Sequence, residues 1–251
     1  MRTVVWLLYC TLYLILVFPL NLYVRFKIKH GKQDEVYPLL TRVVRTWADR
    51  LLKVAGVQVS VTGLANVPDS AALFVCNHQG NFDIPICLCK IGPVKSMVSK
   101  KEIAKIPGIH SWMSYFDCLF MDRGDARQSL RCLNEAQALL EKGRSVVIFP
   151  EGTRSRGPLM GEFKPGALRC ALKAKVPIVP VAIDGSYKVL EAHGLWIHPA
   201  HVRVTVLPPV PTADMEKEHT RTISEDIHAM IENALQISMA QDADKKENPD
   251  G

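Results

Sequence analysis

The chain has little of what marks several large classes of protein. Its seven cysteines are an odd number, and Cys87 and Cys89 are separated by one residue, whereas metal-binding pairs are separated by two or more. The sequence contains no nucleic-acid-binding motif and no internal repeat, and its basic residues do not alternate with aromatics along one stripe. It therefore predicts reduced cysteines, no metal site and no nucleic-acid partner.

Charged side chains are missing from residues 3–24. About 22 residues at ~1.5 Å each reach roughly 33 Å as a helix, which is enough to cross the apolar core of a bilayer. Pro19 and Asn21 interrupt this segment, so a helix embedded in one leaflet is the competing prediction. No small-residue cleavage site follows, which argues against a removed signal peptide. Four basic residues come next and predict that the remaining chain lies on the cytoplasmic side: Arg25, Lys27, Lys29 and Lys32.

Residues 38–55 have the pattern of an amphipathic helix with a basic face. Such a helix either lies on a membrane surface or packs on the folded domain. Because it follows the hydrophobic segment, we favour the membrane surface and assign residues 1–55 to one membrane-associated unit. The basic side chains that would face anionic lipid are Arg42, Arg45, Arg50 and Lys53.

The chain has 251 residues, 48% of them hydrophobic, and can bury a sizeable core. Strand-like apolar runs alternate with helical periodicity through residues 56–240. This alternation predicts an α/β domain with a central, mostly parallel or mixed sheet flanked by helices. The polar residues 241–251 are predicted to form a disordered tail. The net charge of +6 favours an acidic partner, such as anionic lipid head groups or phosphorylated small molecules.

The stretch Asn77-His78-Gln79-Gly80-Asn81-Phe82-Asp83 follows the apolar run 71–76. The imidazole of His78 and the carboxylate of Asp83 thus come just after a buried strand, where α/β proteins present polar groups to ligands. Histidine, with an unperturbed pKa of about 6.5, accepts a proton near neutral pH, and a carboxylate fixes its tautomer. The pair is a candidate general base and its orienter. By themselves the two residues fit a surface-loop histidine and a helix N-cap equally well.

Three further stretches combine an apolar run with polar or proline residues. Asp122-Arg123 follows the run 119–121, Glu151-Gly152-Thr153-Arg154 follows 146–150, and the last run is Val176-Pro177-Ile178-Val179-Pro180. In this order, and together with the His-x4-Asp box, they resemble the motifs of the glycerolipid acyltransferases, most closely the bacterial 1-acylglycerol-3-phosphate O-acyltransferases. The resemblance covers roughly residues 57–209.

This resemblance implies an enzyme of phospholipid biosynthesis at the cytoplasmic face of the inner membrane. It would move a fatty acyl group from acyl-CoA or acyl carrier protein to the sn-2 hydroxyl of 1-acylglycerol 3-phosphate, giving phosphatidic acid. His78 would be the direct general base with Asp83 behind it, and a thioester needs neither metal nor cofactor. The resemblance implies that Lys100, Arg123 and Arg154 bind the substrate phosphate. It also implies that Glu151 binds a glycerol hydroxyl or an arginine. Gly152 would let the backbone approach the substrate closely, and Thr153 would support the loop.

Two positions depart from the family pattern. Gly80 stands where a serine is common, and Asp117 stands where a glycine usually precedes the Asp-Arg strand. These departures bear on local geometry and on the acceptor, which among relatives is also another lysolipid or glycerol 3-phosphate. Two alternatives from other classes are a hydrolase or transferase with Cys76 as nucleophile, two residues before His78, and a non-catalytic membrane-binding protein.

Overall fold

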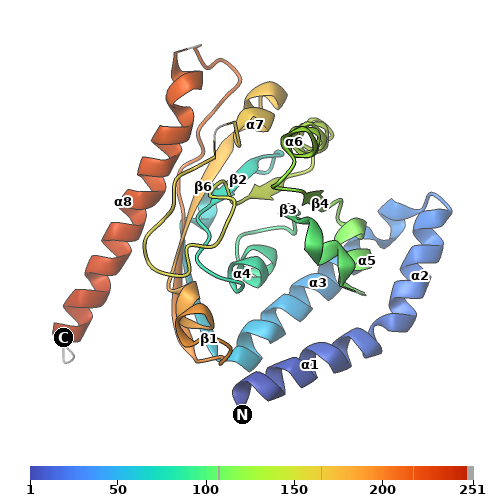
Figure 1. The fold of residues 1–251 in the computed structure, drawn as a ribbon. Helices are drawn as coiled ribbons and strands as arrows, with labels where there is room; N and C mark the ends of the chain where they lie inside the picture. Colours follow the sequence, from blue (N-terminus) through green and yellow to red (C-terminus); the bar gives the residue numbers. More distant parts are fainter. Residues whose placement is uncertain (107, 165, 217, 248–251) are drawn as a thin grey trace.

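The computed structural model describes residues 1–106, 108–164, 166–216 and 218–247. Its centre is a seven-stranded mixed sheet with strand order β1-β7-β6-β2-β5-β3-β4 (Figure 1). The strands are β1 (Val57–Thr62), β2 (Leu73–Cys76), β3 (Ser96–Lys100), β4 (Leu119–Met121), β5 (Val146–Ile148), β6 (Ile178–Asp184) and β7 (Ala200–Val206). β6, β2, β5, β3 and β4 are parallel, β7 is antiparallel to β6, and β1 is parallel to β7. The predicted α/β class with a mixed sheet is confirmed.

Helices cover both faces of this sheet (Figure 1). Along β2, Phe74 and Cys76 pack into the core that contains α3 and α4, whereas Leu73 and Val75 pack into the core that contains α6, α7 and α8. A strand between two helical layers buries every side chain, which is why β2 is a continuous apolar run. The helices of these layers are α3 (Gln33–Ala55), α4 (Asp83–Cys89), α6 (Ala126–Glu141), α7 (Arg169–Ala174) and α8 (His219–Glu247).

Shorter elements connect these layers: α5 (Ile109–Tyr115), η1 (Leu64–Asn66), η2 (Lys101–Lys105), η3 (Ser186–Lys188) and η4 (Glu191–His193). α6 begins at a side-chain N-cap, because the carboxylate of Asp125 accepts hydrogen bonds from the backbone N–H groups of Arg127 and Gln128. At the other end of the chain, α8 continues through Glu247 into the segment predicted to be a disordered tail. Residues 248–251 of that tail lie outside the described residues.

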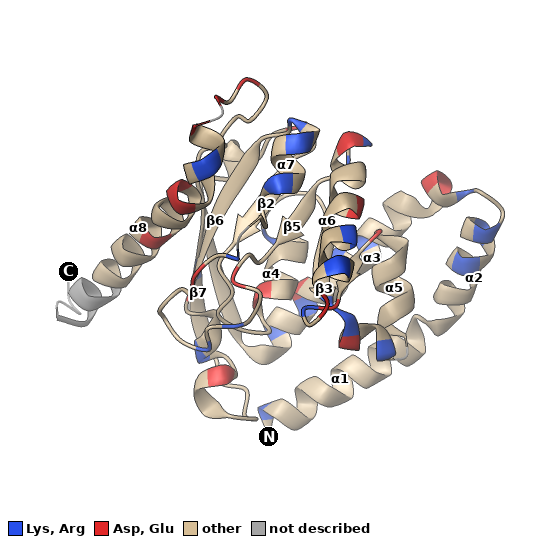
Figure 2. Ribbon diagram, turned by 45° about the horizontal axis from the view of Figure 1, so that its top comes forward, with Lys and Arg blue, Asp and Glu red and all other residues tan. Residues whose placement is uncertain are grey.

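The N-terminal segment forms two helices, α1 (Arg2–Leu16) and α2 (Phe18–Lys29), whose axes differ by 47°. Pro19 lacks the N–H that would continue the helix, and its ring crowds the preceding turn, which explains the bend at Val17. Figure 2 shows that α1 carries no charged side chain after Arg2. No single helix within the described ranges is long and apolar enough to cross a membrane, whereas the bent pair together meets the length and composition required.

The third helix, α3, begins at Gln33 rather than Pro38, and its apolar face is buried in the domain. Leu40 and Leu52 are at most 1% exposed, and each such leucine contributes about 2 kcal/mol of burial free energy. Arg45 donates hydrogen bonds to two backbone carbonyls of the domain, at 3.1 and 3.4 Å. The interpretation that α3 lies on a membrane by its apolar face is therefore wrong. Periodicity defined that face correctly, but protein covers it rather than lipid.

Candidate active site

The predicted site residues lie at one edge of the sheet, because the parallel strands β2, β5, β3 and β4 all end there. His78 follows β2, Glu151 follows β5, Lys100 ends β3 and Arg123 follows β4. Neighbouring strands are about 4.8 Å apart, so β3 and β4 lie roughly 10 and 14 Å from β2. Of the loops after β5, β3 and β4, the loop after β5 is therefore the one that meets the His-x4-Asp box.

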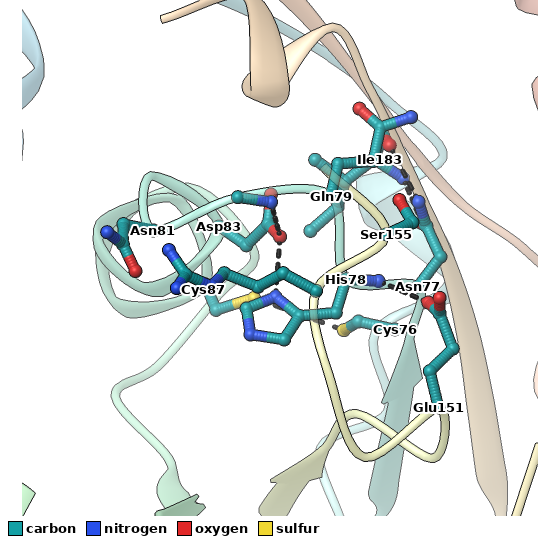
Figure 3. A network of polar contacts seen from close by, with 12 residues as sticks. Cys76, Asn77, His78, Gln79, Asn81, Asp83, Cys87, Glu151, Ser155 and Ile183 are labelled. Atoms are coloured by element: carbon teal, nitrogen blue, oxygen red, sulfur yellow. Dashed lines mark hydrogen bonds and ion pairs between the residues drawn. The ribbon is translucent and has the colours of Figure 1, made fainter. Parts of the chain in front are cut away.

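His78 and Asp83 are in direct contact (Figure 3). The Nδ1 atom of His78 lies 2.7 Å from Oδ2 of Asp83, and the backbone N–H of Gly80 donates to the same oxygen at 2.9 Å. The imidazole also stacks on the ring of Phe149, with centroids 4.2 Å apart. Asp83 is completely buried and His78 is 9% exposed. The imidazole is thus fixed at Nδ1 and across its face, the arrangement expected of an oriented base.

Glu151 joins the two loops of the site. Its Oε1 accepts the backbone N–H of His78 at 2.6 Å, and its Oε2 accepts the backbone N–H of Gly161 at 2.8 Å. Burial raises the pKa of the Glu151 carboxyl, and these two hydrogen bonds oppose that rise. The binding of Glu151 to a glycerol hydroxyl or an arginine stays a prediction, and the structure shows a second role for this carboxylate. Both oxygens already accept backbone N–H groups, because a buried carboxylate requires donors to offset its lost hydration.

The rest of the loop after β5 lies against the His-x4-Asp box. Gly152 has a φ of +71°, a left-handed conformation that glycine adopts without strain, so the turn itself accounts for this glycine. Thr153 is exposed. Arg154 pairs with Glu191, Nη1 to Oε1, at 2.9 Å, and the backbone N–H of Ser155 donates to the carbonyl of His78 at 2.8 Å. The loop therefore brings Arg154 close to the box.

Lys100 and Arg123 are exposed and lie farther along the same edge. Lys100 pairs with Glu102 at 3.5 Å, and Lys101 pairs with Asp122. Asp122 thus forms its salt bridge with Lys101 rather than with its neighbour Arg123. Of the three predicted phosphate-binding cations, the structure brings only Arg154 next to the loop of His78.

A family model described as acyltransferase matches residues 58–184, which is half of the chain. The chain belongs to the acyltransferase family. It is 39% identical over 145 residues to a probable 1-acyl-sn-glycerol-3-phosphate acyltransferase of Mycoplasma pneumoniae, and 37% identical over 157 residues to the chloroplastic 1-acyl-sn-glycerol-3-phosphate acyltransferase LPAT1 of Arabidopsis thaliana. These alignments cover 56% and 61% of this chain, and it spans 54% and 44%, about half, of the length of those relatives.

The fold of this chain is also similar to a solved structure. The crystal structure of the 1-acyl-sn-glycerophosphate (LPA) acyltransferase PlsC from Thermotoga maritima aligns with a TM-score of 0.74 at 26% sequence identity. The alignment covers 96% of this chain and 98% of that chain. The similarity therefore includes the N-terminal helices as well as the sheet.

Three polar residues of the candidate site were not predicted. The side-chain amide of Asn77 donates to the carbonyl of Ile183 and accepts its N–H, at 2.9 and 2.7 Å, and Oε1 of Gln79 accepts the N–H of Gly185 at 2.9 Å. These bonds tie the box to the end of β6. Their position inside the box was the only sequence signal for Asn77 and Gln79. For Glu191 there was none, because it lies in η4, far along the chain from the box.

The alternative with Cys76 as nucleophile has little structural support. Cys76 is fully buried, and its Sγ lies 3.9 Å from Sγ of Cys87. The hydrogen bond with Cys76 is the main cause that raises the pKa of the Cys87 thiol well above its usual value, and burial raises it further. Reactive cysteines sit in partly exposed, electropositive surroundings instead. Within the described parts of the chain, no group of three or more His, Cys, Asp or Glu side chains is arranged to hold a metal ion.

Proposed function

We propose that this acyltransferase moves a fatty acyl group from a thioester to the sn-2 hydroxyl of 1-acylglycerol 3-phosphate, forming phosphatidic acid. The observation that carries this proposal is the oriented His78–Asp83 pair with Arg154 beside it, which combines a base with a cation for a phosphate. The names of the relatives agree with it, since they are 1-acyl-sn-glycerol-3-phosphate acyltransferases from bacteria and plants.

The acceptor hydroxyl is a weak nucleophile and needs activation, whereas the thioester carbonyl is already a good electrophile. Nε2 of His78 removes the hydroxyl proton as the oxygen attacks that carbonyl carbon. Asp83 accepts the Nδ1–H, which places the lone pair of the neutral imidazole on Nε2, and it stabilises the imidazolium that forms. The C–S bond then breaks, and the proton passes from His78 to the leaving thiolate. A base of this kind contributes on the order of a hundredfold to ten-thousandfold in rate.

Arg154 is the proposed ligand of the acceptor phosphate. One of its nitrogens, Nη1, is engaged by Glu191, and its side chain is 31% exposed. A guanidinium has five N–H donors in a planar fork, so donors remain for two parallel hydrogen bonds to a phosphate. Lys100, Arg123 and Thr153 stay predictions for the same substrate, and acyl-CoA and acyl carrier protein both remain candidate donors.

The test is to incubate purified protein with 1-acylglycerol 3-phosphate and each donor, and to identify the product by mass spectrometry. Glycerol 3-phosphate and 1-acylglycerol serve as competing acceptors. Arg154→Ala should weaken use of the phosphate-bearing acceptor by about tenfold to a hundredfold, and Arg154→Lys should recover part, because a point charge does not reproduce a bidentate fork. Arg127→Ala, on the exposed face of α6, is the matched control. An equal loss with 1-acylglycerol would contradict the phosphate role.

We also propose that α1 and α2 hold the protein on the cytoplasmic face of the membrane. Large apolar side chains on these helices are at least half exposed: Val4, Val5, Leu7, Leu8, Leu12, Ile15, Leu16, Phe18, Leu22 and Phe26. Contiguous apolar surface of this kind marks an interaction site on a folded protein. A lysolipid keeps its acyl chain in the leaflet and its hydroxyl near the head groups, so an enzyme held at that depth avoids extracting it into water.

Leu12→Gln combined with Leu16→Gln tests this membrane role. Both side chains are more than 60% exposed, so the fold should tolerate the change. We expect weaker flotation with anionic phospholipid vesicles and lower activity on vesicle-bound acceptor, with activity on detergent-dispersed acceptor retained. Equal losses in vesicles and in detergent would mean that α1 supports the fold instead.

A further inference from the structure

We propose that Glu191 is a positioning residue that sets Arg154 for the acceptor phosphate and occupies the space beside Gly80. The proposal rests on the function proposed above. Glu191 comes from η4, beyond the end of β6, and its side chain is only 4% exposed. Nothing about its sequence neighbourhood suggests a role at the site.

One oxygen of Glu191 joins two loops of the site. Its Oε1 accepts the backbone N–H of Asn81 at 2.9 Å and the Nη1–H of Arg154 at 2.9 Å. Asn81 belongs to the loop that carries His78, whereas Arg154 belongs to the loop after β5. A carboxylate buried this deeply depends on its cationic partner, since removing one member of a buried pair leaves an uncompensated charge. The guanidinium is therefore held at a fixed place relative to the loop of the base.

The other oxygen, Oε2, lies against Gly80. It is buried and has no hydrogen-bond partner within the described structure. A Cβ atom built on Gly80 would lie 2.4 Å from Oε2 and 2.9 Å from Cδ of Glu191, well inside van der Waals contact. Any residue other than glycine would have to displace the carboxylate. The departure at Gly80 noted in the sequence thus has a physical cause, because the side chain of Glu191 fills the space that a serine side chain would enter.

The acceptor explains why this spacing matters. Its phosphate and its reacting hydroxyl are carried by adjacent carbons of glycerol, so the distance between them varies little. A base and a phosphate-binding arginine must match that distance, and misplacement of either lowers the rate. By bonding to both loops, Glu191 sets the separation of Arg154 from the His-x4-Asp box and thereby favours acceptors with a phosphate next to the hydroxyl.

The first test compares steady-state kinetics of Glu191→Ala and Glu191→Gln with the unaltered protein. Glu191→Ala should raise KM for 1-acylglycerol 3-phosphate by about tenfold, the effect of losing one charge-assisted hydrogen bond, and leave KM for the thioester unchanged. Glu191→Gln should raise it less, because the amide oxygen still accepts hydrogen bonds. Glu162→Gln is the matched control, an exposed carboxylate in the segment between β5 and α7. A fall in kcat with an unchanged acceptor KM would overturn the positioning role.

The second test is a double-mutant cycle between positions 80 and 191. Gly80→Ser as a single change should lower both kcat/KM and Tm. Added to Glu191→Ala, which removes the clashing carboxylate, Gly80→Ser should lower neither quantity further. Equal losses in both backgrounds would overturn the contact. Failure of the unaltered protein to form phosphatidic acid would overturn the proposed function, and with it the phosphate role of Glu191. If phosphatidic acid forms but the effects of changes at positions 80 and 191 are simply additive, the Glu191 proposal alone is overturned.

Discussion

Asp83→Asn removes the charge behind the base while keeping the shape of the side chain. The remaining amide oxygen can still accept the N–H of Gly80, so the loop should keep its conformation. In the proposed transition state an imidazolium stands 2.7 Å, Nδ1 to Oδ2, from the carboxylate. Two unit charges with centres ~4 Å apart attract by about 4 kcal/mol at an effective dielectric constant of 20. A neutral amide retains part of this, so we expect a loss of about 2–4 kcal/mol.

That loss corresponds to a fall in kcat of about thirtyfold to a thousandfold. The acceptor KM should change little, because the imidazolium exists only after proton transfer has begun. His78→Ala removes the base itself and should lower kcat by roughly a hundredfold to ten-thousandfold, at least as much as Asp83→Asn. The double variant should be no slower than His78→Ala, since the carboxylate has nothing to orient once the imidazole is gone.

Initial rates of thiol release with detergent-dispersed 1-acylglycerol 3-phosphate measure these effects, and circular dichroism checks the fold. Asp49→Asn is the matched control, because this carboxylate on α3 pairs with Lys53 and Lys90 away from the site. Two results would refute the reasoning. One is near-normal kcat in a folded His78→Ala or Asp83→Asn protein, and the other is a double variant whose loss equals the product of the single losses.

Glu151→Gln should lower the free energy of unfolding by about 2–4 kcal/mol. The amide oxygen can accept only one of the two backbone N–H groups, and the amide N–H groups then face the second backbone donor. An unchanged Tm would contradict this. Lys95 is 3% exposed, and burial lowers its pKa to about 8. Between that value and its unfolded pKa near 10.5, only the unfolded state holds the proton, so stability should rise with pH by up to about 3 kcal/mol. Chemical denaturation of Lys95→Met should lack this rise, and parallel pH curves would refute it. Asp117, with φ 53°, should tolerate Gly within about 1 kcal/mol of unfolding free energy and lose about 1–2 kcal/mol on change to Val.

Local patterns account for the part of the fold that could be predicted. Apolar runs such as residues 71–76 mark strands buried on both faces, and Pro19 marks the bend between α1 and α2. What covers an apolar face cannot be read from periodicity. Leu40 and Leu52 of α3 would suit a bilayer as well as a protein core, and only tertiary packing decides between them. We favoured a membrane surface as the partner of the apolar face of α3 because the helix follows a hydrophobic segment, but the protein core covers that face.

The same distinction between local and tertiary contacts applies to the candidate active site. His78 and Asp83 are five residues apart in one loop, so their contact is a local property that sequence spacing can predict. The carboxylates that hold Arg154 and the backbone of His78 are contributed from 37 and 73 residues away. Glu151 was recognised as a site residue, but its hydrogen bonds with backbone N–H groups were not predicted. Every residue except proline carries such a donor, so residue identities contain no signal for it.

The two departures from the family motifs follow from this geometry. At position 117 the backbone is left-handed, with φ 53°, which explains why glycine suits it; Asp is among the residues that tolerate this region, and here its carboxylate also pairs with Arg144 at 3.4 Å. At position 80 the missing side chain makes room for Glu191. Each substitution thus has a partner elsewhere in the chain, and neither removes a group that acts on the substrate. A motif read one position at a time registers both as losses. In the folded chain, the glycine at position 80 lies beside a carboxylate that joins the loop of the base to the cation.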